Sequence, residues 1–267
     1  MGAKIDRQKV RDSFHRGAPD YDVHAVVQRR VVERIAGMLQ AERVSPARLL
    51  DIGSGTGRLL ARLVDLYPEA AAVGVDLALG MCRAASENLS SKRVQIINAD
   101  AESLPFAADS FDLVVSTSTY QWLSSLDQAF AEARRVLAPG GLFCFALFGE
   151  KTLFELRNSY KTALKGGANR SHSFFSQQEV QAAMQRAGFS GSRVSSEFEV
   201  ELHPDVPELL RSLKRIGAGS TAPVAAKGLS ERRVMLEMMA AYRDSYGRNG
   251  EIPATYEVIY GVAGKPA

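Results

Sequence analysis

One carboxylate and three glycines at alternate positions are the residues of this chain best suited to hold a cofactor. A short apolar run ends at Asp51, and Gly53, Gly55 and Gly57 follow before a helical pattern begins. Glycine removes the side chain where a backbone must turn sharply and lie against a ligand. An acid and a glycine-rich turn between a strand and a helix therefore predict a nucleotide-type binding loop.

The spacing of these glycines separates three kinds of loop. The nicotinamide fingerprint G-x-G-x-x-G fails because Arg58 and Leu60 stand where its third glycine is needed. A phosphate-binding P-loop fails because no Gly-Lys-Ser/Thr follows. The remaining pattern, D-x-G-x-G-x-G, resembles the cofactor loop of class I S-adenosylmethionine-dependent methyltransferases and implies that S-adenosylmethionine is the cofactor. The loop residues assigned to it are Asp51, Gly53, Ser54, Gly55 and Gly57.

Two further acids follow predicted strands downstream of this loop. The strand at 72–76 ends at Asp76, where a strand-end acid binds the ribose hydroxyls in this fold type. Asp76 is equally suited to cap the next helix, and the two roles are compatible. A third strand, at 94–100, ends at Asp100. The resemblance implies that Asp100 accepts the adenine amino group and that the backbone of Ala101 meets the ring edge. It also places Gln28, Leu77, Met81 and Ser116 at the cofactor.

Strand and helix patterns alternate between residues 47 and 148, which predicts a parallel sheet with right-handed crossovers. Helices are expected at 4–16, 22–42, 58–66, 152–165, 175–188, 204–217 and 230–246, and the later strands at 111–116, 137–143, 192–202 and 254–262. The resemblance adds that the last strand is inserted antiparallel. We therefore expect an α/β, Rossmann-like class I methyltransferase fold with a seven-stranded, mostly parallel sheet and helical lid insertions.

The length of 267 residues favours one methyltransferase domain over two equal ones. Its expected parts are an N-terminal helical lid at 1–45, the cofactor-binding core at 46–148, helical substrate and lid insertions with one strand at 149–250, and a C-terminal strand at 251–267. The insertions should lie over the carboxyl ends of the strands, the edge at which ligands bind in open α/β sheets.

Composition favours a cytoplasmic enzyme without nucleic-acid or membrane partners. Hydrophobic residues make up 46% of the chain and charged residues 24%, and the net charge is only +3. No signal peptide or membrane-spanning apolar stretch is evident. The two cysteines, Cys82 and Cys144, lie inside predicted elements, which favours buried packing in a reducing compartment. No metal-ligand cluster is apparent, and a monomer is expected.

Residues outside the core must select the substrate. Tyr21, flanked by two aspartates, is poor core material and is expected to reach the reaction centre from an N-terminal lid. Phe14 is expected to pack in the core. After the fourth strand, Tyr120 and Gln121 are candidates to line the substrate pocket, whereas Trp122 is expected to be buried against the sheet.

A basic helix near residue 210 extends the resemblance. The segments 208–218 and 252–262 contain Arg-Ser-Leu-Lys-Arg-Ile-Gly-Ala and Pro-Ala-Thr-Tyr, and with 111–122 and 152–157 they resemble the malonyl-acyl-carrier-protein O-methyltransferases, which begin pimelate-moiety synthesis for biotin. An ordinary solvated basic face is the alternative. One departure stands out. Where family members often carry Asn-Arg-Phe or His-Arg-Phe, this chain has His-Ser-Phe starting at His172, with an arginine displaced upstream.

The reaction implied is methylation of the free malonyl carboxylate, giving a methyl ester. That carboxylate is ionised near neutral pH and is already nucleophilic, so no general base is required. A closed pocket must supply a counter-charge, because burying an unpaired carboxylate is costly. Arg211 is the predicted counter-charge, with Tyr21 and Tyr256 as hydrogen-bond donors that orient the acceptor oxygen. His172, although a loop histidine is often merely exposed, is a further candidate substrate contact.

The partner implied is an acidic acyl-carrier protein, or coenzyme A, carrying a malonyl thioester. A local basic patch should steer the carrier protein. The candidates are Lys161, Lys165, Arg170, Lys214 and Arg215. Other readings remain open, namely a methyltransferase acting on another small carboxylic acid or a quinone precursor, and a catalytically silent module that binds S-adenosylmethionine. A nicotinamide oxidoreductase is disfavoured by the glycine spacing.

Overall fold

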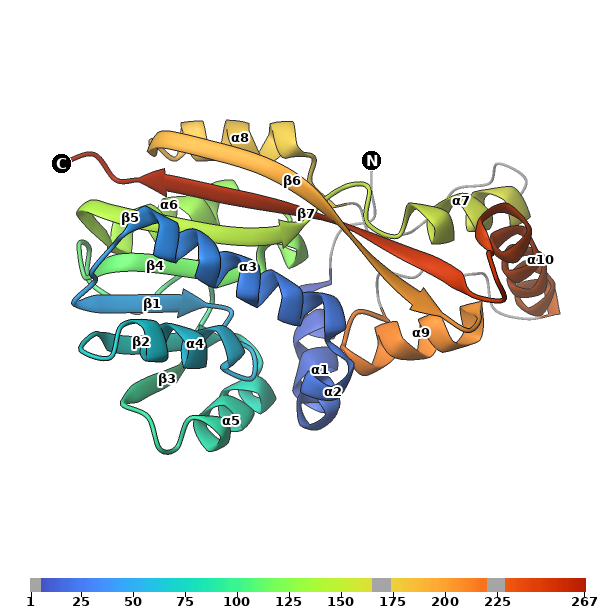
Figure 1. Cartoon of the computed structure of the whole chain (residues 1–267), viewed down its shortest axis with the longest axis horizontal. Coiled ribbons are helices and arrows are strands. Elements are labelled where there is room, and N and C mark those ends of the chain that lie inside the picture. Colours follow the sequence, from blue (N-terminus) through green and yellow to red (C-terminus); the bar gives the residue numbers. More distant parts are fainter. Residues whose placement is uncertain (1–5, 165–173, 220–228) are drawn as a thin grey trace.

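Seven strands form one mixed sheet at the centre of the chain, as the computed structural model in Figure 1 shows; it describes residues 6–164, 174–219 and 229–267. The strands are β1 (Arg48–Ile52), β2 (Ala71–Asp76), β3 (Val94–Asn98), β4 (Phe111–Thr117), β5 (Leu137–Phe148), β6 (Ser190–His203) and β7 (Ile252–Gly264). Their order is β3-β2-β1-β4-β5-β7-β6. Only the pairs β5–β7 and β6–β7 are antiparallel. The predicted seven-stranded sheet with an antiparallel last strand is confirmed.

The α-helices are α1 (Arg7–Gly17), α2 (Tyr21–His24), α3 (Val26–Glu42), α4 (Arg58–Leu66), α5 (Leu79–Asn88), α6 (Asp127–Val136), α7 (Phe154–Ala163), α8 (Gln177–Arg186), α9 (Val206–Arg215) and α10 (Leu229–Tyr246). Two short 3₁₀ turns, η1 (Ala18–Asp20) and η2 (Tyr120–Trp122), complete the described elements. Within the described residues no helix is both long and apolar enough to cross a membrane.

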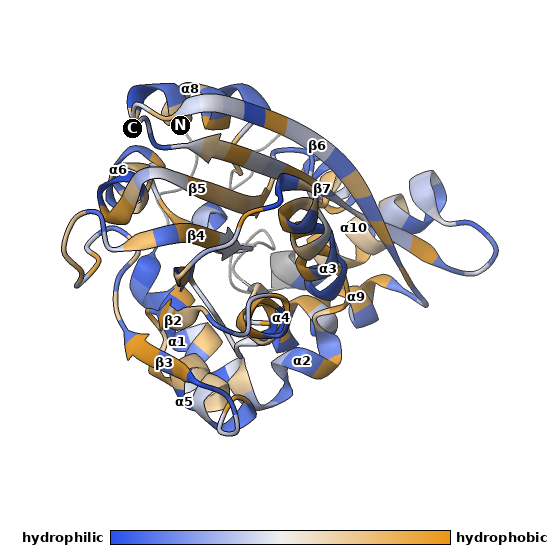
Figure 2. Cartoon of the chain, turned by 60° about the vertical axis from the view of Figure 1, so that its left-hand side comes forward, coloured by the Kyte–Doolittle hydropathy of each residue, from blue (hydrophilic) through white to orange (hydrophobic). Residues whose placement is uncertain are grey.

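Alternate residues of each central strand enter two separate cores, one on each face of the sheet. Leu49 packs with residues of α3 and α4, whereas its neighbour Leu50 packs with residues of α6 and α8. Because side chains of a strand point alternately to its two faces, a strand covered on both sides reads as an unbroken apolar run. Figure 2 shows these hydrophobic residues along the strands and hydrophilic ones on the outer side of α8. Cys82 and Cys144 are free and buried, as predicted.

The last two strands extend beyond the sheet and carry helices with them. Pairing between β5 and β7 ends at Phe148 and Val258, but pairing between β6 and β7 continues to His203 and Ile252. This overhanging ribbon lies beside α7, α9 and α10 in Figure 1. Both strands are longer than the predicted 192–202 and 254–262. At the end that overhangs β5, each strand provides the other with backbone partners.

Two boundaries near the cofactor edge differ from the prediction. β3 ends at Asn98, so Asp100 lies in the turn after the strand rather than at its tip. The N-terminal region is broken into α1, η1, α2 and α3 at Gly17, Pro19 and Ala25. Proline has no backbone N–H and favours the first turn of a helix, so Pro19 starts a new turn instead of continuing α1.

Candidate active site

A hollow lies at the carboxyl ends of β1, β2 and β4, beneath α1. Its floor comes from the glycine loop and the tip of β2, and its cover from α1 and η2. The lining residues are Arg7, Val10, Arg11, Phe14, Tyr21, Gly53, Gly55, Val75, Asp76, Leu77, Ala78, Met81, Ala99, Ala101, Thr117, Ser118, Thr119, Trp122 and Leu123. We refer to this hollow as the cofactor pocket. Of the residues predicted to bind the cofactor, Gly53, Gly55, Asp76, Leu77, Met81 and Ala101 lie here.

The three glycines of the loop serve different purposes. Gly53 has a φ of 72°, and a Cβ there would collide with the side chain of Thr119. Gly55, with a φ of 55°, has no atom within 4 Å of where a Cβ would stand, so its open side lies toward the pocket. Gly57 begins α4 in the left-handed region, and a Cβ there would press on Leu89. Gly57 does not line the cofactor pocket, and close packing against Leu89 accounts for the absence of a side chain there.

Asp76 is the carboxylate held at the floor of the cofactor pocket. Its Oδ2 accepts the backbone N–H of Gly55 at 3.0 Å and its Oδ1 accepts that of Ala78 at 2.8 Å. Burial raises the pKa of Asp76 to about 6, and these two hydrogen bonds oppose the rise. Asp76 can cap the next helix and also bind ribose hydroxyls, as the sequence suggested, because one carboxylate oxygen can accept more than one hydrogen bond.

Asp51 and Ser116 lie behind the pocket wall, not in it. Asp51 is 1% exposed, and neither of its carboxylate oxygens has a hydrogen-bond partner within the part of the chain described. Burial, followed by the nearby charge of Asp76, raises the pKa of Asp51 to about 8. The fully buried Ser116 hydroxyl donates to the carbonyl of Ile52 at 2.7 Å and so joins β4 to β1. Neither residue is thus placed for the direct cofactor contact that the sequence predicted.

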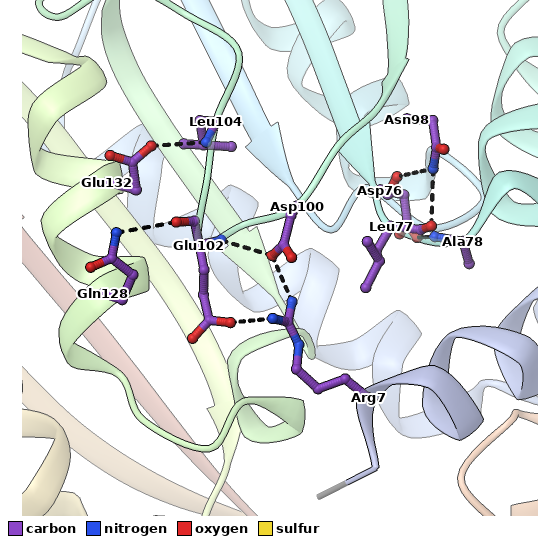
Figure 3. A network of polar contacts seen from close by, with 10 residues as sticks. All are labelled: Arg7, Asp76, Leu77, Ala78, Asn98, Asp100, Glu102, Leu104, Gln128 and Glu132. Carbon is purple, nitrogen blue, oxygen red and sulfur yellow. Dashed lines mark hydrogen bonds and ion pairs between the residues drawn. The ribbon is translucent and has the colours of Figure 1, made fainter.

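Asp100 is engaged by the first helix. Figure 3 shows Arg7, on α1, reaching both Asp100 and Glu102. The Nη2 atom of Arg7 lies 2.6 Å from Oδ1 of Asp100, and its Nη1 pairs with Glu102. The backbone N–H of Glu102 also donates to Asp100. Asp100 does not line the pocket, although Ala101 does, and its contact with adenine stays a prediction.

A second hollow adjoins the first and is mostly apolar. Its lining residues are Phe14, Tyr21, Gln28, Ser118, Gln121, Trp122, Phe148, Thr152, Leu153, Phe174, Leu213, Ile216, Ala218 and Tyr256. We call it the acceptor pocket. Phe14, Tyr21, Ser118 and Trp122 line both hollows. The Phe14 ring lies edge-on to Trp122, with centroids 5.5 Å apart, and edge-on to Tyr21 at 6.3 Å. This aromatic group separates the two hollows.

Two tyrosine hydroxyls and two amides supply polar groups of the acceptor pocket. Tyr21 comes from α2, whereas Tyr256 comes from the overhanging part of β7 and is 4% exposed. Burial raises the pKa of both tyrosines above the ordinary value of 10.0, and nearby carboxylates raise it further. Both hydroxyls therefore stay protonated and can donate hydrogen bonds. The structure brings together Tyr21, Tyr256, Gln28 and Gln121 as candidate site residues.

Of the three residues of η2, Gln121 and Trp122 line the acceptor pocket, whereas Tyr120 does not. Tyr120 is 0% exposed and packs edge-on against Phe130, Phe143 and Phe145 on the α6 side of the sheet. Its assignment to the substrate pocket is wrong, because a 3₁₀ turn sends successive side chains in different directions. Trp122, expected to be simply buried, is half-buried and lines both pockets.

Arg211 lies outside the acceptor pocket. It is 57% exposed, and its guanidinium pairs with Glu208 at 2.8 Å, as does that of Arg215 at 2.9 Å. Leu213 and Ile216 occupy the pocket wall instead, because α9 turns its apolar stripe inward. The structure thus does not bring Arg211, the predicted counter-charge, into the acceptor pocket. His172 lies outside the described residues, as do Lys165 and Arg170.

A third hollow was not anticipated from the sequence. It lies between the glycine loop and the start of α3, and it contains two cations, Arg29 and Arg58, together with Gln28 and Ser54. Arg29 donates to the backbone carbonyl of Asp22 at 2.8 Å, and Arg58 lies 3.4 Å from its carboxylate. Arginine pairs are common on solvated helices, so spacing alone does not mark them as site residues.

The residues of these hollows fit S-adenosylmethionine. The open side of Gly55, the Asp76 carboxylate and the apolar wall at Leu77 and Met81 suit a nucleoside. The buried hydroxyl of Ser54, which lacks a hydrogen-bond partner among the described residues, belongs to the wall of the third hollow, beside the loop. Within that same part of the chain no cluster of three His, Cys, Asp or Glu side chains could hold a metal ion.

Comparisons with known proteins agree with this geometry. Residues 50–145 match the model of a methyltransferase domain. The chain is 59% identical over 263 residues to the malonyl-[acyl-carrier protein] O-methyltransferase of Geobacter sulfurreducens, covering 97% of this chain and 98% of that protein. This chain belongs to the malonyl-[acyl-carrier protein] O-methyltransferase family. The family member from Methylovorus sp. is 38% identical, with 98% and 90% covered.

Solved structures share the fold of this family member at low identity. The YcgJ protein of Bacillus subtilis has a TM-score of 0.60 at 19% identity, covering 88% of this chain and 99% of that one. Phosphoethanolamine N-methyltransferase 2 of Haemonchus contortus, bound to S-adenosyl-L-methionine, has a TM-score of 0.57 at 21% identity, covering 88% and 53%. The predicted methyltransferase fold and S-adenosylmethionine cofactor are confirmed, and the nicotinamide alternative is excluded.

Proposed function

We propose that this protein transfers a methyl group from S-adenosylmethionine to the free carboxylate of a malonyl thioester carried by an acyl-carrier protein. The observation that carries the proposal is the junction of the two pockets. A cofactor pocket and a mostly apolar acceptor pocket share Tyr21 and Trp122, so a methyl donor and its acceptor can meet there. The family relationship supports malonyl as the acceptor.

The ribose and the carboxylate of the cofactor have natural partners in this arrangement. We assign its ribose to Asp76 and its methionine carboxylate to the hollow that contains Arg29 and Arg58. Guanidinium groups suit carboxylates because their planar donors match both oxygens. This assignment would leave the sulfonium methyl near Tyr21, because Tyr21 lines all three hollows.

The protein's contribution to the reaction is alignment. A malonyl carboxylate is ionised near neutral pH, so it attacks without losing a proton. When bound, S-adenosylmethionine supplies an electrophilic methyl group on a positively charged sulfur. A carboxylate oxygen then forms the new bond to carbon while the carbon–sulfur bond breaks, leaving a neutral ester and a neutral thioether. Tyr21 and Tyr256 hold the acceptor oxygens by hydrogen bonds, and such positioning contributes several kcal/mol, about 7–11 at most.

Exposed cations around the acceptor pocket suit an acidic carrier protein. Arg211, Lys214 and Arg215 lie on the outer side of α9, whose inner side lines the pocket, and Lys161 is exposed on α7. We propose that these residues steer the carrier protein, since complementary charge raises association rates and is weakened by salt. Arg211 thereby takes a docking role in place of its predicted catalytic one. We further propose that the protein acts as a monomer.

The test is a direct assay for the methyl ester. The protein is incubated with S-adenosylmethionine and malonyl-carrier protein, and the product is weighed by mass spectrometry for one added methyl group. Malonyl-coenzyme A, a small dicarboxylic acid and a quinone precursor are run in parallel. Methylation of the malonyl carriers alone supports the proposal. A methylated quinone precursor with unmodified malonyl thioesters would refute it.

A further inference from the structure

The helix α9 ends in a turn for which glycine is the least strained residue. Gly217 has a φ of 75°, and its backbone N–H donates to the carbonyl of Lys214 at 3.1 Å. The next residue, Ala218, donates to the carbonyl of Leu213 at 2.9 Å. This pair of hydrogen bonds is the Schellman motif, in which a left-handed residue, usually glycine, terminates a helix. Leu213 and Ala218 line the acceptor pocket, so the turn belongs to its wall.

The same glycine leaves room for an aromatic ring of the first helix. A Cβ at Gly217 would stand 2.9 Å from Cδ1 of Phe14, which is too close for two carbon atoms that are not bonded to each other. The backbones also approach closely at this place, because a Cβ on Gly17 would stand 3.1 Å from the carbonyl oxygen of Arg215. The ends of α1 and α9 are therefore tightly packed, with the Phe14 ring against the backbone of the turn.

Phe14 also reaches the cofactor pocket. It packs against the cluster that contains Ala78 and Met81, two residues of that pocket, and its ring lies edge-on to Trp122. Phe14 itself lines both the cofactor pocket and the acceptor pocket. One ring thus contacts the turn after α9, the wall of the cofactor pocket and the space for the acceptor. Because protein interiors are closely packed, a shift on one side of such a ring is felt on the others.

We propose that Gly217 is a positioning residue, which holds the Phe14 ring between the two pockets so that an acceptor bound in one pocket retains the cofactor in the other. This inference rests on the function proposed above and adds a positive coupling between the two ligands. Such coupling is reciprocal, so the cofactor should tighten binding of the acceptor by the same factor. It also gives the Ile-Gly-Ala end of the basic segment a role at the reaction centre, through Phe14.

The coupling follows from the supports on either side of the ring. A bound acceptor fills the space beside Phe14, so the ring cannot turn away from the cofactor in that direction. The turn after α9 supports the ring from another direction, as long as residue 217 has no side chain. A Cβ at position 217 would displace the ring, and the acceptor would then no longer hold it against the cofactor pocket.

A second glycine of this chain provides a matched control. Gly188 follows α8, a helix of 10 residues like α9, and has a φ of 80°. The backbone N–H groups of Gly188 and Phe189 donate to carbonyls of the last turn of α8 at 3.0 and 3.2 Å, which is the same motif. The nearest described atom to a Cβ at Gly188 would be in Arg134, at the ordinary distance of 3.4 Å. Gly188→Ala therefore imposes the backbone strain of Gly217→Ala without the collision.

Release of S-adenosylhomocysteine measures the coupling in the absence of turnover. Its dissociation rate is recorded by stopped flow, with and without saturating malonyl-pantetheine, for the wild type and both glycine variants. We expect malonyl-pantetheine to slow release about fivefold or more in the wild type and in Gly188→Ala, as is typical of coupling between two sites. In Gly217→Ala the two rates should agree within about twofold. Thermal unfolding of the two variants should show similar losses of stability, so that strain alone does not explain the difference.

Phe14→Ala tests the same contact from the other side and does not depend on the folding of Gly217→Ala. Without the ring, malonyl-pantetheine should slow release by less than about twofold, and adding Gly217→Ala should change this little, because residues that act through one contact are not additive. The inference is overturned if malonyl-pantetheine leaves release from the wild type unchanged. It is equally overturned if Gly217→Ala or Phe14→Ala retains the slowing seen in the wild type.

The two proposals fail in distinguishable ways. If the mass assay detects malonyl methyl ester while malonyl-pantetheine leaves release of S-adenosylhomocysteine unchanged, the inference fails and the proposed function stands. If no malonyl ester forms with any carrier, the proposed function fails and the inference falls with it.

Discussion

The guanidinium of Arg7 lies 2.6 Å from the carboxylate of Asp100, which attaches the first helix of the chain to the turn after β3. A second ion pair, from Arg7 to Glu102, strengthens the same attachment. Arg7 itself lines the cofactor pocket, and Figure 3 shows its guanidinium between the carboxylates of Asp100 and Glu102. These ion pairs hold α1 over the cofactor pocket, so we expect them to slow the departure of a bound nucleoside.

Arg7→Ala should weaken retention of the cofactor product. Removal of both ion pairs loosens α1, so S-adenosylhomocysteine should dissociate several-fold faster, in keeping with the roughly 0.2–1 kcal/mol of a partly exposed ion pair. Stopped-flow measurement of the dissociation rate is the check. Lys9→Ala removes an exposed cation of the same helix, paired with Asp6, and is the matched control. Equal dissociation rates for the two variants would disprove the role of Arg7.

Asp51→Asn should stabilise the cofactor-free protein at alkaline pH. The pKa of Asp51 is about 8 in the folded protein against 3.8 for the unperturbed group, so the folded state holds a proton that the unfolded state releases. The contribution of Asp51 to the free energy of unfolding is greatest below about pH 4 and declines as the pH rises to about 8. A pKa difference of one between the folded and unfolded states corresponds to about 1.36 kcal/mol, so the loss is on the order of a few kcal/mol.

Urea denaturation of the wild type and of Asp51→Asn, from about pH 4.5 to 9, measures this effect. The free energies of unfolding should be similar at the acid end, with the variant more stable at the alkaline end. A difference that does not change with pH would show that the buried carboxyl of Asp51 titrates normally.

Tyr256→Phe and Tyr120→Phe form a matched pair that separates the acceptor pocket from the core. Tyr256 lines the pocket, and loss of its donor should lower turnover about tenfold or more, the cost of a hydrogen bond to a charged group. Tyr120 is enclosed by phenylalanines on the α6 side, so its variant should stay within about twofold of wild type. Steady-state turnover of malonyl-carrier protein is measured for both variants. A comparable loss of turnover in both would reject our placement of the substrate beside Tyr256.

Arg211→Ala should change docking of the carrier protein rather than chemistry. Because this guanidinium is exposed and paired with Glu208, we expect KM for malonyl-carrier protein to rise a few-fold, more so at low salt, with kcat nearly unchanged. Turnover of malonyl-pantetheine should be unaffected. Arg62→Ala removes another exposed arginine, paired with Glu33, and controls for general surface charge. A fall in kcat by orders of magnitude on both substrates would restore Arg211 to the reaction centre.

Much of the cofactor site could be predicted from the sequence because its determinants are local. Gly53 and Gly55 need positive φ angles, and Asp76 follows a buried strand directly, so residue type and spacing indicate both the turn and the acid. The order of alternating strands and helices likewise predicts a parallel sheet, since crossovers of this length have one handedness. These features depend on neighbours within a few residues along the chain.

Residue types and their spacing were enough to specify the fold, the cofactor and the loop that receives it. Which side chains meet across the acceptor pocket depends instead on packing between distant elements. Tyr21 and Tyr256 are far apart in the chain and converge because β7 overhangs the sheet. Arg211 points outward because hydrophobic burial orients α9 by its apolar stripe, and the rotation of a helix about its axis is set by the elements it packs against. The guanidinium of Arg211, which the sequence pattern placed at the reaction centre, therefore lies on the surface of the folded protein.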